Sequence, residues 1–173
     1  HQKISEGIEG LNSTIQDIRA YILDLRPRQL RGGESLPHGV QRLLDEFRKN
    51  ARAKTTLATS ENGFSTLPRQ NALALFHICQ ESLANVAKHA CAFDVEVQLW
   101  ATDEQVLLKV SDDGRGFDIE DADETIGHGL SNMKRRARKV GGDIKITSTD
   151  NDGTTVLAWV PWKDAQATPK DDS

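Results

Sequence analysis

Apolar residues recur at alternating steps of four and three along the first part of the chain. They are Ile4, Ile8, Leu11, Ile15, Ile18, Ile22 and Leu25, and most positions between them are polar. This spacing keeps one seam turned towards a partner helix, as in coiled coils and helix bundles. Pro27 disfavours helical geometry in the residue before it, so the helix should end there. The pattern predicts one long helix, which we interpret as one arm of a helical hairpin.

Downstream of this helix, the pattern predicts one domain of helices and antiparallel strand pairs. Residues 28–35 contain Gly32 and Gly33 and are expected to form a linker. The expected helices cover 36–47, 68–90 and 130–140, and the expected strands cover 55–59, 95–99, 106–110, 144–148 and 155–160. Helices and strand pairs in this order, without strict alternation, predict an α+β sandwich with helices on one face of a sheet.

Composition and charge then exclude several classes of function. The chain has 173 residues, of which 37% are hydrophobic, and this supports one ordinary core. It contains no run of about 20 consecutive apolar residues, the length that spans a bilayer. Its formal net charge of -4 provides no general basic field for nucleic acid or an anionic membrane. The two cysteines fit neither a disulfide framework nor a metal site, which favours a reducing cytoplasmic setting.

The expected helix over residues 68–90 carries polar residues opposite its apolar face. Its apolar face comprises Leu75, Phe76, Cys79, Leu83, Val86 and Ala90. Glu81, Asn85 and Lys88 lie on the other side. A carboxylate, an amide and an ammonium group along one line suit a hard cation and the phosphates that accompany it. The alternative is a solvated helix face with a favourable charge pattern.

Three glycine-containing segments are further candidates for ligand contacts. Residues 112–116 directly follow a hydrophobic strand, where glycines let the backbone approach a planar ligand and a carboxylate could accept a hydrogen bond from an exocyclic amine. Residues 127–132 lie at the start of the next helix, where free N–H groups bind anions. Residues 153–155 bring hydroxyl groups to the last strand. Taken singly, each segment is also explained by an ordinary turn or by β-propensity.

Together and in this order, the four segments closely resemble the ATP-binding boxes of sensor histidine kinases. The matching residues are 81–90, 112–117, 127–130 and 153–155. These kinases are Bergerat-type ATPases, a superfamily that includes DNA gyrase B subunits, MutL-type repair proteins and heat-shock chaperones. Four motifs in the same order are far more specific than any single motif. Residues 17–27 resemble the end of the second helix in the dimerisation and phosphotransfer hairpin of nitrate-sensor and desaturase-thermosensor kinases. The resemblance implies a two-layer α/β sandwich with a mixed sheet covered by helices, preceded by one long helix.

The resemblance implies that the polar side of the long helix binds the metal and the phosphates. Asn85 corresponds to the asparagine that coordinates Mg²⁺, and Lys88 and His89 to residues that reach phosphate oxygens. Glu81 corresponds to the catalytic acidic residue near the attacked γ-phosphate, where it could orient or deprotonate the receiving imidazole. The end of the ATP lid and the helix after it supply three more residues, which are Gly127, Gly129 and Leu130.

The adenine side of the nucleotide is assigned to the other two segments by the same resemblance. Asp112 corresponds to the aspartate that receives the adenine amine. Gly114 and Gly116 correspond to the glycines below the ring. Thr155 corresponds to a hydroxyl near the adenine, and Thr154 is the second candidate for that position.

The implied activity is that of an ATP-dependent protein-histidine kinase with ATP and Mg²⁺ as cofactors. The γ-phosphoryl group would pass to a histidine on the hairpin and then to an aspartate of a response regulator. The full-length protein would be a homodimer, without nucleic acid as a partner. This chain would make no direct membrane contact and would lie in the cytoplasm, either free or as the cytoplasmic part of a membrane-bound sensor.

The chain departs from the family at the phosphoacceptor histidine, which lies on the first hairpin helix and precedes an acidic residue. The five histidines are His1, His38, His77, His89 and His128, and none has this setting. We therefore expect the first arm of the hairpin to be missing. The expected division is a partial hairpin helix over 1–30, an ATP-binding catalytic domain over 31–162 and a disordered tail over 163–173.

Two other functions remain open from the sequence. One is a Bergerat-fold ATPase that hydrolyses ATP to drive a clamp, although the short lid and the helix ending at Pro27 argue against it. The other is an interaction module in which bound nucleotide sets only the position of the lid. Adding a separate protein that carries the missing helix discriminates between them, because only a competent kinase would phosphorylate it.

Overall fold

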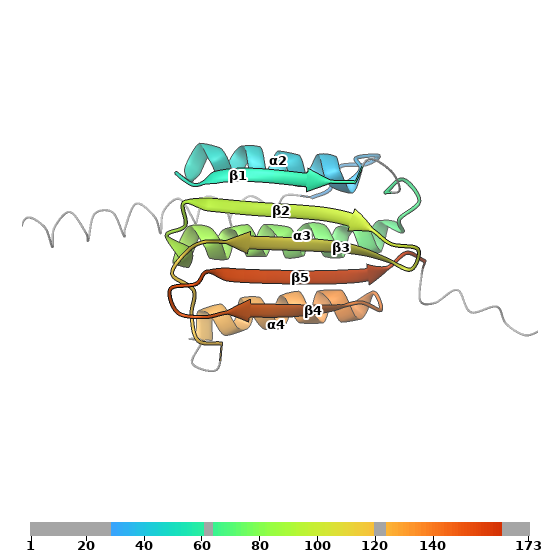
Figure 1. The fold of residues 1–173 in the computed structure, drawn as a ribbon. Helices are drawn as coiled ribbons and strands as arrows, with labels where there is room; N and C mark the ends of the chain where they lie inside the picture. Colours follow the sequence, from blue (N-terminus) through green and yellow to red (C-terminus); the bar gives the residue numbers. More distant parts are fainter. Residues whose placement is uncertain (1–28, 61–63, 120–123, 164–173) are drawn as a thin grey trace, which may run out of the picture.

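Three α-helices cover one face of a five-stranded sheet in the part of the chain that the structure describes, residues 29–60, 64–119 and 124–163 (Figure 1). The structure is a computed structural model. Its elements are α2 (Leu36–Asn50), β1 (Lys54–Thr59), α3 (Arg69–Asn85), the π-helical turn η1 (Val86–Ala90), β2 (Asp94–Ala101), β3 (Gln105–Asp112), α4 (Glu124–Lys139), β4 (Asp143–Ser148) and β5 (Thr154–Pro161). The expected α+β sandwich is confirmed. The helix expected over residues 4–25 and the tail beyond residue 163 lie outside the described residues.

The sheet is mixed, with the strand order β1-β2-β3-β5-β4. Strand β1 pairs in parallel with β2, and the other three pairs are antiparallel. Parallel neighbours need a long crossover connection, and α3 provides it between β1 and β2. The antiparallel pairs carry the hairpins that the alternating sequence predicts.

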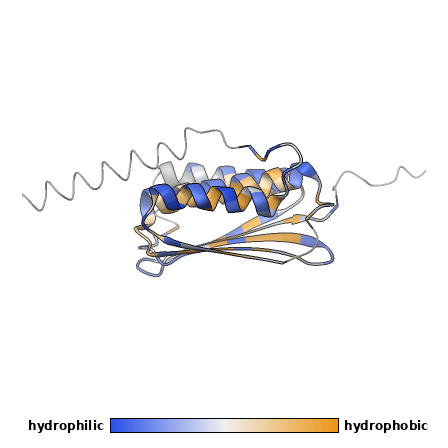
Figure 2. Cartoon of the chain, turned by 90° about the horizontal axis from the view of Figure 1, so that it is seen from above, coloured by the Kyte–Doolittle hydropathy of each residue, from blue (hydrophilic) through white to orange (hydrophobic). Residues whose placement is uncertain are grey.

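The core lies between the sheet and the helices, and the other face of the sheet has no helix over it in the described part of the chain (Figure 2). Alternate residues of the central strands point into this core, because successive strand residues face opposite sides. They are Val95, Val97 and Leu99 of β2, Val106, Leu108 and Val110 of β3, and Val156, Ala158 and Val160 of β5. The next residues of the same alternation, Asp112 and Thr154, therefore face the helix layer at the end of the sheet.

Residues 29–35 pack on the folded domain, whereas the sequence predicts a linker over residues 28–35. Leu30 is 2% exposed and lies in the hydrophobic core. Gly39 of α2 makes room for it, because a Cβ on Gly39 would overlap the Leu30 side chain and lie 3.2 Å from the ring of Phe76. The glycine pair at 32–33 forms a turn on the surface.

No helix in the described part of the chain is long and apolar enough to cross a membrane.

Candidate functional site

A pocket of about 480 Å³, its open mouth included, lies where α3 and β3 end, β5 begins and α4 passes by. Its lining residues are Ser82, Asn85, Val86, His89, Ala90, Val110, Asp112, Gly116, Phe117, Leu130, Thr154 and Val156. The lining is therefore mainly apolar and carries a few polar side chains. This combination is typical of sites for small organic ligands.

Asp112 provides the carboxylate of the pocket. It is half-buried at the end of β3, directly opposite Thr154 of β5. Its Oδ1 accepts a hydrogen bond from the backbone N–H of Gly114 at 2.9 Å. Burial raises the pKa of Asp112, while hydrogen bonds from the backbone N–H groups of Gly114 and Thr154 oppose this rise. A half-buried acceptor of this kind gains from a ligand that brings an N–H donor.

The two glycines after Asp112 hold the loop against its neighbours. A Cβ on Gly114 would overlap the carbonyl oxygen and Cβ of Ala90, and the N–H of Arg115 donates to that carbonyl at 2.8 Å. Gly116 has a φ of +61°, and a Cβ there would overlap the carbonyl oxygen of Thr149. Gly116 lines the pocket, whereas Gly114 lies behind it at the end of η1.

The long helix changes geometry at the pocket. It is α-helical up to Asn85 and continues as a π-helical turn over Val86–Ala90, which Cys91 ends in the left-handed region with a φ of 51°. π-helical turns are rare in proteins, and those that occur often lie at functional sites. Asn85 and His89 line the pocket, and the half-buried Lys88 lies just outside its lining.

Glu81, Asn85 and Gly129 come together beside the pocket. A Cβ on Gly129 would lie 2.6 Å from Glu81 Oε1 and 3.6 Å from Asn85 Nδ2, so α4 passes these side chains closely because residue 129 is a glycine. The prediction that a helix starts after Gly129 is wrong. Helix α4 starts at Glu124, and both Gly127 and Gly129 lie within it, so the free N–H groups of its first turn lie further towards the N-terminus.

The threonines of β5 lie on opposite sides of the sheet. Thr154 lines the pocket, whereas Thr155 belongs to the opposite face because strand residues alternate. The hydroxyl of Thr154 lies 2.9 Å from Ser148 Oγ. Ser148 in turn accepts a hydrogen bond from the N–H of Phe117 at 3.0 Å and donates to the carbonyl of Gly153 at 3.1 Å. These bonds fix the pocket wall that carries Phe117 and Thr154.

Several lining residues were given no role from the sequence, although Ser82, Val86, Ala90 and Phe117 lie within the matching motifs. Ser82 is 3% exposed and donates to the carbonyl of Ile78 at 2.8 Å, on the side of α3 that faces the pocket. The other missed residues are apolar, namely Val86, Ala90, Val110, Phe117 and Val156. Strand alternation could have found Val110 and Val156, since each lies two residues from a polar lining residue. Phe117 has no periodic signal, because it follows a turn.

Comparison with known proteins agrees with this geometry. Residues 70–164 match the family described as histidine kinase-, DNA gyrase B-, and HSP90-like ATPases. The chain is 36% identical over 145 residues to the sensor histidine kinase LiaS of Bacillus subtilis, which covers 84% of this chain and 39% of LiaS. It is also 36% identical to the sensor histidine kinase MctS of Rhizobium johnstonii, over 91% of this chain and 34% of MctS. The sensor protein VraS of Staphylococcus saprophyticus is 31% identical, over 91% of this chain and 45% of VraS.

A solved structure shares the fold. The histidine kinase domain of the blue-light activated histidine kinase from Erythrobacter litoralis EL346 superposes with a TM-score of 0.59 and 19% identity, covering 87% of this chain and 75% of that domain. The chain spans less than half the length of the curated relatives named above. The chain therefore belongs to the histidine kinase-, DNA gyrase B-, and HSP90-like ATPase family, and carries the ATP-binding catalytic domain typical of sensor histidine kinases.

Proposed function

We propose that the pocket binds Mg-ATP and that the domain transfers the γ-phosphoryl group to a histidine of a helical hairpin. The observation that carries this proposal is that the pocket has two chemically different ends. One end holds the half-buried Asp112 between apolar walls, and the other holds Asn85 next to Glu81 and Gly129. A ligand with a planar, amine-bearing base and an anionic tail matches both ends.

At the base end, Asp112 accepts the exocyclic amine of adenine. The apolar residues of the pocket enclose the ring, and they are Val86, Ala90, Val110, Phe117, Leu130 and Val156. Thr154 adds a hydroxyl group to this end. The raised pKa of Asp112 supports this role, because the amine would stabilise a carboxylate that burial otherwise disfavours.

At the phosphate end, Asn85, Lys88 and His89 follow one another along the end of α3 and η1. They are the residues of this chain that would bind the phosphate oxygens. Glu81 lies one helical turn before Asn85, where it would orient the receiving imidazole and accept its proton. Catalysis would then rest on positioning and on neutralisation of charge.

The donor set fits Mg²⁺ that arrives with the nucleotide. Among the described residues there is no group of three or more His, Cys, Asp or Glu side chains that could hold a metal ion by themselves. Mg²⁺ is usually bound by one or two protein groups together with substrate phosphates and water. The amide oxygen of Asn85 would be such a group, and the ion would supply charge neutralisation at the β- and γ-phosphates.

The proposed partners follow from the activity. A histidine-bearing hairpin would receive the phosphoryl group, a response regulator would take it from the hairpin, and the full-length protein would form a homodimer through its hairpins. The hairpin part, expected over 1–30, would end before Gln29, because Leu30 is buried in the core of the catalytic domain. The catalytic domain would then extend to residue 162, and residues 163–173 would be a tail. The cytoplasmic side of the cell is where ATP and a response regulator would be available to it.

Phosphoryl transfer to a separately produced hairpin tests the proposal. Wild-type chain with Mg-ATP should phosphorylate the histidine of the hairpin, and Glu81→Gln should lower the rate at least about 100-fold while nucleotide still binds. Glu104→Gln is the matched control, since Glu104 is an exposed carboxylate in the turn between β2 and β3. Binding of Mg-ATP without any transfer would replace the kinase with a nucleotide-binding interaction module. Steady release of phosphate without transfer would indicate an ATPase.

A further inference from the structure

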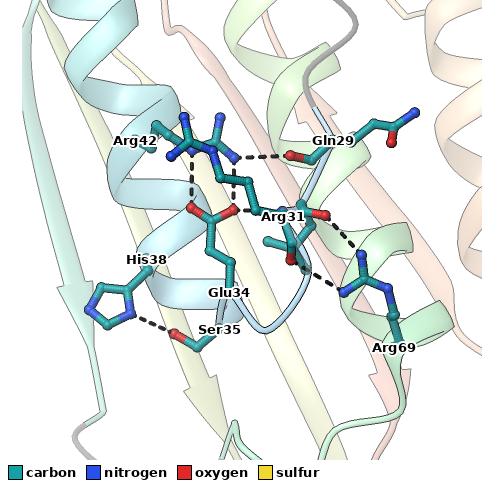
Figure 3. Close-up of polar contacts among 8 residues, drawn as sticks. Gln29, Arg31, Glu34, Ser35, His38, Arg42 and Arg69 are labelled. Carbon is teal, nitrogen blue, oxygen red and sulfur yellow. Dashed lines mark hydrogen bonds and ion pairs between the residues drawn. The ribbon is translucent and has the colours of Figure 1, made fainter.

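Residues 29–35, here called the strap, are tied to two helices of the domain by two arginines (Figure 3). Arg42 lies on α2, and Arg69 is the first residue of α3. Between them they donate hydrogen bonds to the carbonyl oxygens of three consecutive strap residues, Gln29, Leu30 and Arg31. The backbone of the strap is therefore held from two sides.

Arg42 forms the more enclosed half of this clamp. Its Nε and Nη2 donate to the two oxygens of Glu34 at 3.0 and 2.8 Å, and Nη2 also donates to the carbonyl of Gln29 at 3.0 Å. Its guanidinium lies 5.8 Å from the ring centre of Phe76 on α3. Glu34 also accepts the N–H of Arg31 at 2.9 Å. This fork geometry is specific to arginine.

Arg69 forms the exposed half of the clamp. Its Nη2 donates to the carbonyl of Leu30 at 2.9 Å and its Nη1 to that of Arg31 at 3.4 Å. The Leu30 side chain is buried in the core next to Gly39, so the same residue is held by its side chain in the core and by its carbonyl at the surface. A simple linker would not need these hydrogen bonds to its backbone or a side chain buried in the core.

The clamp lies at the opposite end of the domain from the pocket. Arg69 and Asn85 are the first and last residues of α3 and are about 24 Å apart along the helix. In Figure 1 the strap, drawn in blue, is at the end of the domain where α2 begins. The pocket is lined by Ser82 and Asn85 from the last turns of α3. Arg42 and Arg69 therefore cannot act by touching the nucleotide.

We propose that Arg42 and Arg69 are positioning residues for phosphoryl transfer, because they make the chain rigid from Gln29 onwards. The clamp then fixes the position of Gln29, through which an acceptor hairpin would be joined to the catalytic domain. This inference rests on the proposed kinase function. Its consequence is that the clamp matters only when the acceptor hairpin is joined to the domain through the strap.

The test compares transfer to a hairpin joined to the chain with transfer to a hairpin supplied as a separate protein. Arg69→Ala should lower kcat for the joined hairpin about ten-fold, and leave the KM for ATP and the rate with the separate hairpin unchanged. Arg69→Lys should recover part of the lost rate, because one donor to Leu30 remains. Amide exchange at Arg31 and Glu34 should be faster in Arg69→Ala, which shows that the strap has been released.

Arg48→Ala is the matched control. Arg48 is also an α2 arginine that donates hydrogen bonds, to Asp45 and to Thr55 of β1, but it does not touch the strap. It should leave both transfer rates unchanged. Equal effects of Arg69→Ala on the joined and separate hairpins, or faster amide exchange in the strap with no change in either rate, would overturn the positioning role. A wild-type chain that binds ATP but phosphorylates neither hairpin would instead overturn the proposed function.

Discussion

Asp112→Asn separates the two effects of the carboxylate, on affinity and on stability. The asparagine has the same shape, and its Oδ1 can still accept the N–H of Gly114 that Asp112 accepts at 2.9 Å. The negative charge that would receive the adenine amine is lost, and an amide N–H₂ group takes the place of one oxygen. A buried hydrogen bond to a charged group contributes about 1.5–3 kcal/mol. The Kd for ATP should therefore rise by a factor of about 10 to 150.

The stability of the nucleotide-free protein should change in the opposite direction. Burial raises the pKa of Asp112 in the folded protein, so the folded state disfavours the carboxylate relative to the unfolded state. At neutral pH the wild type carries this cost in full. The advantage of Asp112→Asn should therefore be largest at neutral pH, and should vanish as the pH falls through the raised pKa towards the ordinary carboxyl pKa of about 4.

Two measurements on the same protein samples check this prediction. Competition with a fluorescent nucleotide gives the affinity, and urea unfolding at several pH values gives the free energy of unfolding. Asp103→Asn is the matched control, because Asp103 is an exposed aspartate in the turn between β2 and β3 and does not line the pocket. Weaker binding by Asp112→Asn together with an equal loss of stability would refute the reasoning, since the carboxylate would then be a structural group.

Three further predictions concern other parts of the domain. Gly116→Ala should lower the free energy of unfolding by at least about 1 kcal/mol in urea unfolding, because φ is +61° and a Cβ would overlap a carbonyl oxygen. Iodoacetamide should label the exposed Cys91 and leave Cys79 unmodified in native protein, because Cys79 is buried and burial raises its pKa to about 12. Labelling of both cysteines at similar rates would contradict this. The Arg42 guanidinium lowers the pKa of Glu34 to about 2. The ionised Glu34 should therefore stabilise the fold by about 1 kcal/mol above pH 5, and unfolding at lower pH should show that this stabilisation is lost towards pH 2. Glu34→Gln should abolish this pH dependence.

Much of the fold follows from local patterns in the sequence. The alternation of Val95, Val97 and Leu99 against polar neighbours predicts a strand with one buried face, and β2 covers these residues. Asn151, Asp152 and Gly153 predict the turn between β4 and β5. These features depend on neighbours within a few residues, so sequence alone was enough.

Features that depend on distant contacts have no local signal in the sequence. The resemblance implies a mixed sheet, but the strands that pair in parallel, β1 and β2, were not predicted, because their pairing depends on the path of α3. The π-helical end of α3 lies where the N–H of Arg115 reaches the carbonyl of Ala90, a contact between segments 25 residues apart. The strap resembles a linker in composition, but Leu30 and two arginines from other elements hold it in place.

The candidate site was likewise predicted only in part from the sequence. The polar residues of the motifs were found because their order along the chain resembles that of a known family, and Asn85, His89, Asp112, Gly116, Leu130 and Thr154 meet in one pocket. The start of α4 was placed too late, because Gly127 and Gly129 suggested a helix boundary. Inside a helix, the missing side chain of Gly129 instead allows close contact with Glu81.

Calorimetric titration of Mg-ATP into the 173-residue chain tests the central claim most directly. We expect saturable binding of one nucleotide per chain, weakened by Asp112→Asn and made insensitive to magnesium by Asn85→Ala. A folded wild-type chain that gives no heat of binding with Mg-ATP or Mg-ADP, and no shift in its melting temperature with either nucleotide, would contradict the account.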